Sequence, residues 1–312
     1  MSTQTQEKFR LITRSDFDGL ITAVILKELA MVDEIKFVHP KDMQDGKIEV
    51  TSRDITTNLP FVEGVHLAFD HHASEMSRVG VKANYVNAPD AQSASRVVYE
   101  YFDGANKCPR VTQEMMEAVD KADSAQFTFD DIMEPKGWVL LSFLTDARTG
   151  LGRFREFRVP NYQLMMDLIE HCRTKTIDEI LALPDVKERV DLYREHQQKA
   201  NEQIRRCAKR YDNLLVLDLR NEEVQYATNR FTVYALYPTC NISIHVMWGM
   251  KKQNTVFATG KSIFDRSSKT DIGELMLSYG GGGHKAAGTC QVDNAKADQV
   301  LQELIRKINA DG

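Results

Sequence analysis

An aspartate followed by two histidines, Asp70-His71-His72, is the part of the sequence best suited to chemistry. It comes directly after a short apolar run, 65–69, that has the pattern of a buried strand. α/β sheets bind ligands beside the carboxyl ends of their strands, and His and Asp are ligands that suit manganese, zinc or iron. The triplet therefore indicates a metal site, although a polar turn is an alternative for so short a motif.

A pair of carboxylates, Asp16 and Asp18, lies where a predicted strand, 9–13, meets a predicted helix, 20–30. Gly19 lets the backbone approach closely at this junction. Capping of the helix and interaction with its dipole are the alternative roles for the two acids. Capping explains one carboxylate better than two, so the pair also points to metal ligands.

Two further acids complete the candidate set. Asp54 follows a segment in which 47–50 is a candidate strand, and Asp123 comes at the end of a predicted helix, 112–122. A carboxylate at a helix C-terminus opposes the dipole, so it needs a partner such as a metal unless solvent surrounds it. Strands that alternate with helices imply a mostly parallel sheet. Its carboxyl edge should collect the expected metal ligands Asp16, Asp18, Asp54, His71 and Asp123.

Four carboxylates at one sheet edge repel one another unless cations hold them. Two divalent ions about 3.5–4 Å apart relieve this repulsion and form a phosphoryl-transfer site. Asp54 is the expected bridge between the ions, and a bridging water attacks phosphorus. We expect His72 to face the phosphate as a charge stabiliser or proton donor, and Asp70 to orient an imidazole.

A run of four glycines, Gly280 to Gly283, forms a second candidate site. The backbone N–H groups of such a run can close on an anion, and His284 and Lys285 add donors. A flexible turn is the alternative, but glycines raise the entropy cost of folding. Arg266 is a candidate bidentate phosphate partner, and a surface arginine is the equal alternative. The expected substrate contacts are Gly281, Gly282, Gly283, His284, Lys285 and Arg266.

The length of 312 residues suffices for two domains. A polar run, 185–210, has few apolar positions and predicts a solvated helix that connects them. We predict an α/β protein. Its domain 1–185 has a mostly parallel sheet flanked by helices, 186–212 is a linker helix, and 213–312 is a smaller α/β domain with a mixed sheet.

Composition narrows the class of partner. The formal net charge of -5 gives no basic field for long duplex nucleic acid, which leaves a small phosphorylated substrate. The five cysteines show no CxxC spacing and read as reduced thiols. The polar N-terminus and the lack of a long apolar segment predict a cytoplasmic location without a membrane partner, and leave a homodimer open.

In their order along the chain these motifs resemble those of the DHH phosphoesterases. The resemblance rests on Asp16-Phe17-Asp18-Gly19, Asp54, Asp70-His71-His72 and Asp123, and on a glycine run that looks like the GGGH signature of the DHH-associated C-terminal domain. It is nearest to nanoRNases, pAp phosphatases, cyclic-dinucleotide phosphodiesterases and exopolyphosphatase-like proteins. It implies two Mn²⁺ ions on the ligand set given above, with Mg²⁺ or Co²⁺ as alternatives, and a C-terminal domain that holds the far end of the substrate.

One position departs from the family pattern. Members have a His or Asp shortly before the first aspartate, whereas Arg14 cannot ligate a cation and is a candidate phosphate contact. The resemblance implies a metal-dependent phosphohydrolase that cleaves short oligonucleotides, linear or cyclic dinucleotides, or 3′-phosphonucleotides by two-metal activation of water. The alternatives are hydrolysis of polyphosphate and a nucleotide-binding protein with weakened catalysis.

Overall fold

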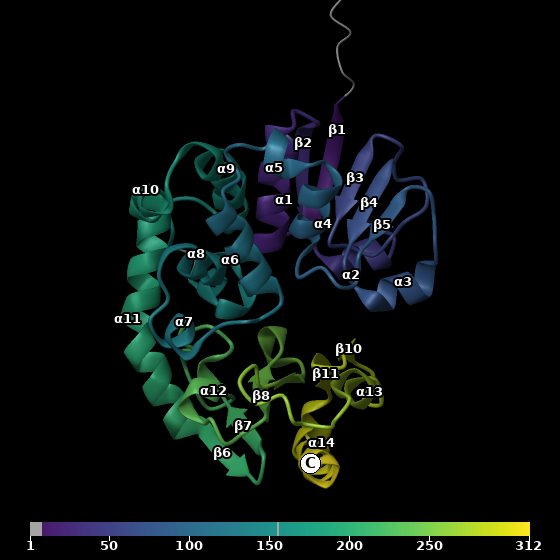
Figure 1. The fold of residues 1–312 in the computed structure, drawn as a ribbon. Helices are drawn as coiled ribbons and strands as arrows, with labels where there is room; N and C mark the ends of the chain where they lie inside the picture. The colour runs from purple at the N-terminus through teal and green to yellow at the C-terminus, as the bar shows by residue number, and fades with distance from the viewer. Residues whose placement is uncertain (1–7, 155) are drawn as a thin grey trace, which may run out of the picture. The chain divides into compact units, whose positions relative to one another are not determined.

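The computed structural model describes residues 8–154 and 156–312 (Figure 1). The chain divides into two compact units. The first comprises the residues up to Phe127 together with Pro135–Asp191, and the second comprises Thr128–Glu134 and Leu192–Gly312. The division falls within α11 (Pro184–Cys207), the long polar helix that the sequence predicts.

A five-stranded parallel sheet forms the centre of the first unit, in the order β2-β1-β3-β4-β5. The parallel sheet predicted for this part of the chain is therefore confirmed. The strand order changes direction between β1 and β3, and sheets of this kind bind ligands beside the carboxyl ends at such a switch point. The strands are β1 (Phe9–Arg14), β2 (Val32–Val38), β3 (Asp54–Thr57), β4 (Leu67–Asp70) and β5 (Tyr85–Asn87).

Helices cover both faces of this sheet. α1 packs on β1 and β2 and α4 on β4, while the opposite face carries α2 and α3, where Ile12 packs with Met43 and Ala68 lies in a cluster with Val79. The helices are α1 (Phe17–Glu28), α2 (Pro40–Gln44), α3 (Ala73–Val79), α4 (Ala94–Tyr101), α5 (Gly104–Lys107), α6 (Gln113–Asp123), α8 (Gly137–Thr145), α9 (Asn161–Thr174) and α10 (Ile177–Ala182), with 3₁₀ turns η1 (Ala147–Thr149) and η2 (Leu151–Arg153).

One strand lies elsewhere than the sequence indicated. The predicted strand over 47–50 is wrong, because this segment is irregular and the next strand, β3, begins at Asp54. β3 lacks a continuous apolar pattern because two of its four residues are threonines. Both are buried, and Thr57 Oγ1 donates to Thr13 Oγ1 at 2.7 Å. Hydroxyl groups that are paired in this way are tolerated inside a parallel sheet.

The second unit is built on a six-stranded sheet in the order β10-β11-β9-β8-β7-β6. The sheet is mixed, so the mixed sheet predicted for this part of the chain is confirmed. β7 and β8 are parallel, and the other neighbouring pairs are antiparallel. The strands are β6 (Ala208–Tyr211), β7 (Leu214–Asp218), β8 (Ile242–Trp248), β9 (Thr255–Lys261), β10 (Gly282–His284) and β11 (Ala287–Val292). The helices are α7 (Phe129–Met133), α12 (Thr232–Leu236), α13 (Ile272–Leu277) and α14 (Ala297–Asp311), with 3₁₀ turns η3 (Met250–Lys252) and η4 (Asn294–Lys296).

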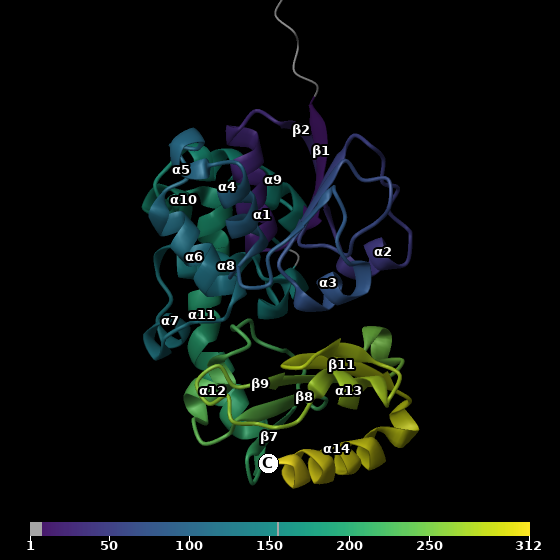
Figure 2. The same cartoon turned by 45° about the vertical axis from the view of Figure 1, so that its right-hand side comes forward.

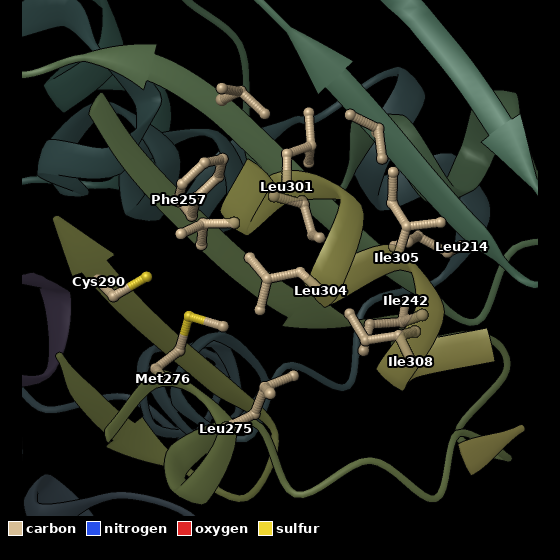
Figure 3. Close-up of a cluster of buried hydrophobic side chains, with 14 of the residues drawn as sticks. Leu214, Ile242, Phe257, Leu275, Met276, Cys290, Leu301, Leu304, Ile305 and Ile308 are labelled. Carbon is tan, nitrogen blue, oxygen red and sulfur yellow. The ribbon is translucent and has the colours of Figure 1, made fainter. Parts of the chain in front are cut away.

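α14 lies along one face of the six-stranded sheet (Figure 2). Alternate residues of β8, such as Ile242 and Ile244, share one buried cluster with residues spaced by four on the helix, such as Leu304 and Ile308. Figure 3 shows Ile242 in this cluster with Leu304 and Ile308. All four side chains are fully buried. Burial of each stabilises the unit by roughly 1.5–3 kcal/mol, so this contact holds the helix on the sheet.

No helix in the described parts of the chain combines the length and the apolar character needed to cross a membrane. All five cysteines lie within the described residues and carry free thiols, four of them buried.

Candidate functional site

The end of β4 places the Asp-His-His triplet at the carboxyl edge of the parallel sheet. Asp70 is the last residue of the strand and is buried. Its Oδ1 accepts the backbone N–H of His71 at 2.8 Å and lies 2.7 Å from His72 Nδ1. The hydroxyl of Tyr85 donates to the other oxygen at 3.3 Å. Because Asp70 engages Nδ1, the imidazole of His72 turns Nε2 away from the strand end.

Three of the predicted metal ligands meet beside this triplet. The ligand atoms of Asp18, His71 and Asp123 all lie within 4.8 Å of one another, and His71 Nε2 is 2.9 Å from Asp123 Oδ2. His71 Nδ1 lies 3.2 Å from the carbonyl oxygen of Ala91, an arrangement that directs Nε2 toward a ligand role. Two carboxylates and one imidazole suit a divalent cation such as Mn²⁺, so these residues fit one ion.

Asp18 is held in the first turn of α1 and is 2% exposed. It accepts hydrogen bonds from two backbone N–H groups at the start of α4, at 3.1 and 2.8 Å, and from Asn58 Nδ2 at 2.9 Å. Burial, followed by the negative charges of Asp123 and Asp16, raises the pKa of Asp18 to about 7. A cation bound among these carboxylates would relieve the repulsion.

His71 shares the electrostatics of this cluster. Burial lowers the pKa of His71, but the hydrogen bond and charge of Asp123, with the charge of Asp18, raise it to about 9. A proton therefore competes with a metal ion for Nε2 of His71. Metal affinity at this site must fall as the pH falls, because His ligates a metal only in its neutral form.

Asp16 caps α1 and forms an ion pair. One oxygen accepts the backbone N–H of Gly19 at 3.0 Å, and the other lies 2.8 Å from Arg14 Nε. Burial raises the pKa of Asp16, and the positive charge of Arg14 opposes this shift. Gly19 is required here, since a Cβ would lie 1.9 Å from the carbonyl oxygen of Arg14. The capping explanation thus holds for Asp16. Its carboxylate lies close to the three clustered ligands and forms an ion pair with Arg14.

The prediction that Asp54 joins this cluster is wrong. Asp54 is the first residue of β3 and pairs in register with Arg10 near the start of β1, so it lies at the amino edge of the parallel sheet. The Arg10 guanidinium binds its two oxygens at 2.7 and 2.9 Å. Burial raises the pKa of Asp54, but hydrogen bonds from Arg10 and from Thr51 outweigh burial and hold it below the usual range. Asp54 forms a structural ion pair and is not positioned to bridge metal ions.

Asn58 is a site residue that the sequence reasoning missed. It directly follows β3, is 2% exposed, and contacts Asp18 through Nδ2. Its Oδ1 is buried without a hydrogen-bond partner among the residues that the structure describes. Asn58 is uncharged, and the strand before it, β3, was predicted over 47–50 instead. Recognition of β3 as a strand would have placed Asn58 at the carboxyl edge.

Arg148 is a second residue that the sequence did not single out. It lies in η1, and its Nε is 2.8 Å from Asp146 Oδ1. Burial lowers the pKa of Arg148, but the charges of Asp146, Asp16 and Asp123 raise it above its ordinary value. A second guanidinium therefore lies within the electrostatic reach of the acidic cluster.

The glycine run folds into a β-hairpin rather than a free loop. β10 pairs antiparallel with β11, with Gly282 opposite Thr289. Gly281 is required by close packing, because a Cβ would lie 2.2 Å from the carbonyl oxygen of Thr289, and a Cβ on Gly283 would lie 2.3 Å from that of Ala287. A Cβ on Gly282 would meet nothing within 4 Å. Packing therefore does not explain why position 282 of the hairpin is a glycine.

The other predicted substrate contacts lie on the surface of the second unit. His284 and Lys285 are exposed at the tip of the hairpin. Arg266 is exposed in the loop after β9, where its Nε donates to the carbonyl oxygen of Ile263 at 3.4 Å. Their role in substrate binding stays a prediction.

A solved structure of a pGpG-specific phosphodiesterase, PggH from Vibrio cholerae, is 62% identical to this chain. The match covers 98% of this chain and 100% of that one, with a TM-score of 0.86. The chain belongs to the DHH phosphoesterase family. Membership of this family, which the order of the sequence motifs predicted, is therefore confirmed.

Other similarities show the shared fold or cover short segments. RecJ from Thermus thermophilus, crystallised with Mn²⁺, is 16% identical, with a TM-score of 0.56 over 98% of this chain and 53% of RecJ. An A-adding tRNA nucleotidyltransferase from Aquifex aeolicus (strain VF5) is 29% identical over 112 residues, which are 34% of this DHH phosphoesterase and 13% of that protein. No family model matches the sequence.

Proposed function

We propose that this DHH phosphoesterase hydrolyses the phosphodiester bond of pGpG. The observation that carries the proposal is the 62% identity, over 98% of the chain, to a phosphodiesterase specific for pGpG. The switch point of the parallel sheet supports it, because Asp18, His71 and Asp123 meet there beside His72. The coarse class, a hydrolase of short nucleotides, is the one that the sequence motifs predict.

Asp18, His71 and Asp123 would hold a divalent cation, and we propose Mn²⁺ because the donor set suits it and RecJ, which shares the fold, was crystallised with it. When bound, the ion neutralises charge and lowers the pKa of a water molecule. Asp70 orients His72 through Nδ1, and Nε2 would stabilise charge on the phosphoryl group or protonate the leaving oxygen.

We further propose that the hairpin of the second unit binds an anionic part of the substrate. Gly282 leaves space that packing does not use, and Lys285 brings a positive charge to the exposed tip. The predicted division of labour assigns catalysis to 1–185 and substrate binding to 213–312. Such a hairpin contact would lower KM without entering the chemical step.

The test is turnover of a panel of substrates by the purified chain with Mn²⁺. The panel contains pGpG, pApA, cyclic di-GMP, a 3′-phosphonucleotide and polyphosphate. We expect release of GMP from pGpG at the highest kcat/KM, and loss of turnover by about 10²-fold or more in His72→Ala. His66→Ala is the matched control, because His66 is exposed and precedes β4 at the opposite edge of the sheet.

Two outcomes would count against the proposal. Absence of pGpG turnover with Mn²⁺ bound would remove it and leave the nucleotide-binding alternative. Release of orthophosphate from polyphosphate, with dinucleotides untouched, would favour the exopolyphosphatase-like alternative.

A cytoplasmic location is part of the proposal, since free thiols on all five cysteines suit a reducing compartment. A homodimer stays a prediction that sedimentation of the purified chain would decide.

A further inference from the structure

Asn58, the residue after β3, lies in the middle of the site. β3 lies between β1 and β4 in the sheet, so its carboxyl end falls between the acids that follow β1 and the triplet at the end of β4. Asn58 holds this position and touches Asp18 at 2.9 Å. A site for two ions needs a bridging carboxylate at such a place, and the nearest acid of β3, Asp54, lies at the other end of the strand.

The amide of Asn58 suits one cation and not two. Its Nδ2 is used on Asp18, which leaves Oδ1 as the single acceptor of the side chain. That oxygen is buried and has no hydrogen-bond partner in the described part of the chain, a state that costs about 1–3 kcal/mol unless a ligand satisfies it. A neutral oxygen of this kind is a ligand for a divalent ion, but it lacks the second oxygen with which a carboxylate bridges a pair.

Arg14 pairs with Asp16, a carboxylate close to the cluster that a second ion would need as a ligand. Its guanidinium lies 2.8 Å from one oxygen of Asp16, and the N–H of Gly19 takes the other oxygen. Both oxygens of Asp16 are therefore engaged. A cation on Asp16 would have to displace the arginine or lie beside it, against charge repulsion.

Arg148 adds a second fixed positive charge. It is held by Asp146 at 2.8 Å, and the charges of Asp16 and Asp123 act on it. The guanidiniums of Arg14 and Arg148 thus offset part of the negative charge that a second ion would otherwise neutralise. Arginine is also suited to bidentate contact with phosphate.

We propose that this site binds one divalent cation per chain, on Asp18, His71, Asp123 and the amide oxygen of Asn58, and that the guanidinium of Arg14 takes the place of the second ion. This differs from the pair of ions that the family resemblance implies. The inference rests on the metal dependence proposed above and not on the identity of the dinucleotide. Arg148 would support Arg14 in contacting the phosphoryl group.

The test counts bound metal without substrate, with Mn²⁺ as the probe. Equilibrium dialysis of the full chain gives the number of ions and their affinity. Electron paramagnetic resonance reports whether an ion is isolated or magnetically coupled to a neighbour about 3.5–4 Å away. We expect one isolated Mn²⁺ per wild-type chain, and a second, coupled ion in the double variant Arg14→His/Asn58→Asp.

Single variants isolate the role of the amide. Asn58→Ala should weaken Mn²⁺ binding by about tenfold or more. Asn84→Ala is the matched control, because Asn84 donates to the carbonyl oxygen of Val65 beside the start of β5, outside the site. Equal Mn²⁺ affinity in Asn58→Ala and wild type would overturn the ligand role of Asn58.

Wild-type protein alone decides the stoichiometry if the double variant does not fold. Two Mn²⁺ bound with similar affinity, a coupled spectrum, or no bound Mn²⁺ would each overturn the inference. One bound Mn²⁺ without pGpG turnover would contradict the proposed substrate and leave the single-ion site in place, so the two failures are distinguishable.

Discussion

Asp70 Oδ1 and His72 Nδ1 lie 2.7 Å apart, and this contact determines which imidazole nitrogen turns away from the end of β4. The carboxylate is buried and is itself fixed by the backbone N–H of His71. A carboxylate in this position favours the tautomer with the proton on Nδ1. The orientation of the His72 ring is thus fixed through Nδ1 before a substrate binds.

Asp70→Asn tests this positioning role. The amide keeps the shape of the side chain, but its N–H₂ can donate to Nδ1 and favour the opposite tautomer. We expect kcat on pGpG to fall by about 10- to 100-fold with smaller changes in KM. Steady-state kinetics would measure the effect, and Mn²⁺ dialysis would serve as its control. Unchanged kcat, or a parallel loss of Mn²⁺ binding, would contradict a role through His72.

Asp54→Ala separates structure from catalysis at the other edge of the sheet. Removal of the carboxylate leaves the Arg10 guanidinium without its bidentate partner, and breaking a buried pair costs about 3 kcal/mol. Because the folded-state pKa of Asp54 is lowered, this stabilisation is present above the carboxyl's ordinary pKa and is lost as the pH falls through the folded pKa. We expect a lower midpoint of urea unfolding and an unchanged number of bound Mn²⁺ ions. Loss of bound Mn²⁺ in a folded Asp54→Ala variant would show that Asp54 is needed for metal binding.

The sequence predicted the fold class, both sheets and most helices, because their apolar periodicity is strong. The sequence-based prediction was wrong for β3, a buried strand made mostly of polar residues. Thr56 and Thr57 weaken the apolar pattern of β3, so the strand was predicted over 47–50 and Asp54 was expected at its carboxyl end. Asn58 then went unnoticed, because a neutral amide carries no signal of its own until its strand is located. The acids after β1 and at the ends of β4 and α6 were predicted correctly because these elements have clear apolar patterns.

Two adjacent glycines allow a matched test of the hairpin. A Cβ on Gly281 would meet the carbonyl oxygen of Thr289 at 2.2 Å, so Gly281→Ala should destabilise the second unit by about 1–3 kcal/mol. Gly282→Ala meets open space and should change stability by less than about 0.5 kcal/mol. If the hairpin binds substrate, Gly282→Ala should raise KM for pGpG with little change in kcat. Unfolding curves and kinetics of both variants would show it, and an unchanged KM in Gly282→Ala would argue against the contact.

The sequence could not distinguish these two glycines. The run reads as one flexible or anion-binding segment, because all four residues are the same and the reason for each lies in the partner strand. The register of β10 with β11 separates the glycines that packing requires from Gly282.

His245 makes the stability of the second unit depend on pH. It lies in β8, where burial lowers its pKa to about 4. Between that value and the ordinary value near 6.5, the unfolded chain binds a proton at this residue and the folded chain does not. The free energy of unfolding therefore falls as the pH drops from about 6.5 to about 4, by up to roughly 3 kcal/mol from this group.

His245→Gln removes this titration. The difference in unfolding free energy between wild type and variant should shrink or change sign as the pH falls from about 7 to about 4, because only wild type loses stability through His245. In a Trp138→Phe background, Trp248 is the sole tryptophan and reports on β8, so urea unfolding followed by its fluorescence isolates the second unit. An NMR titration of the His245 ring gives the folded-state pKa directly. Parallel stability curves for the two proteins, or a ring that titrates near 6.5, would show that burial does not hold this imidazole neutral.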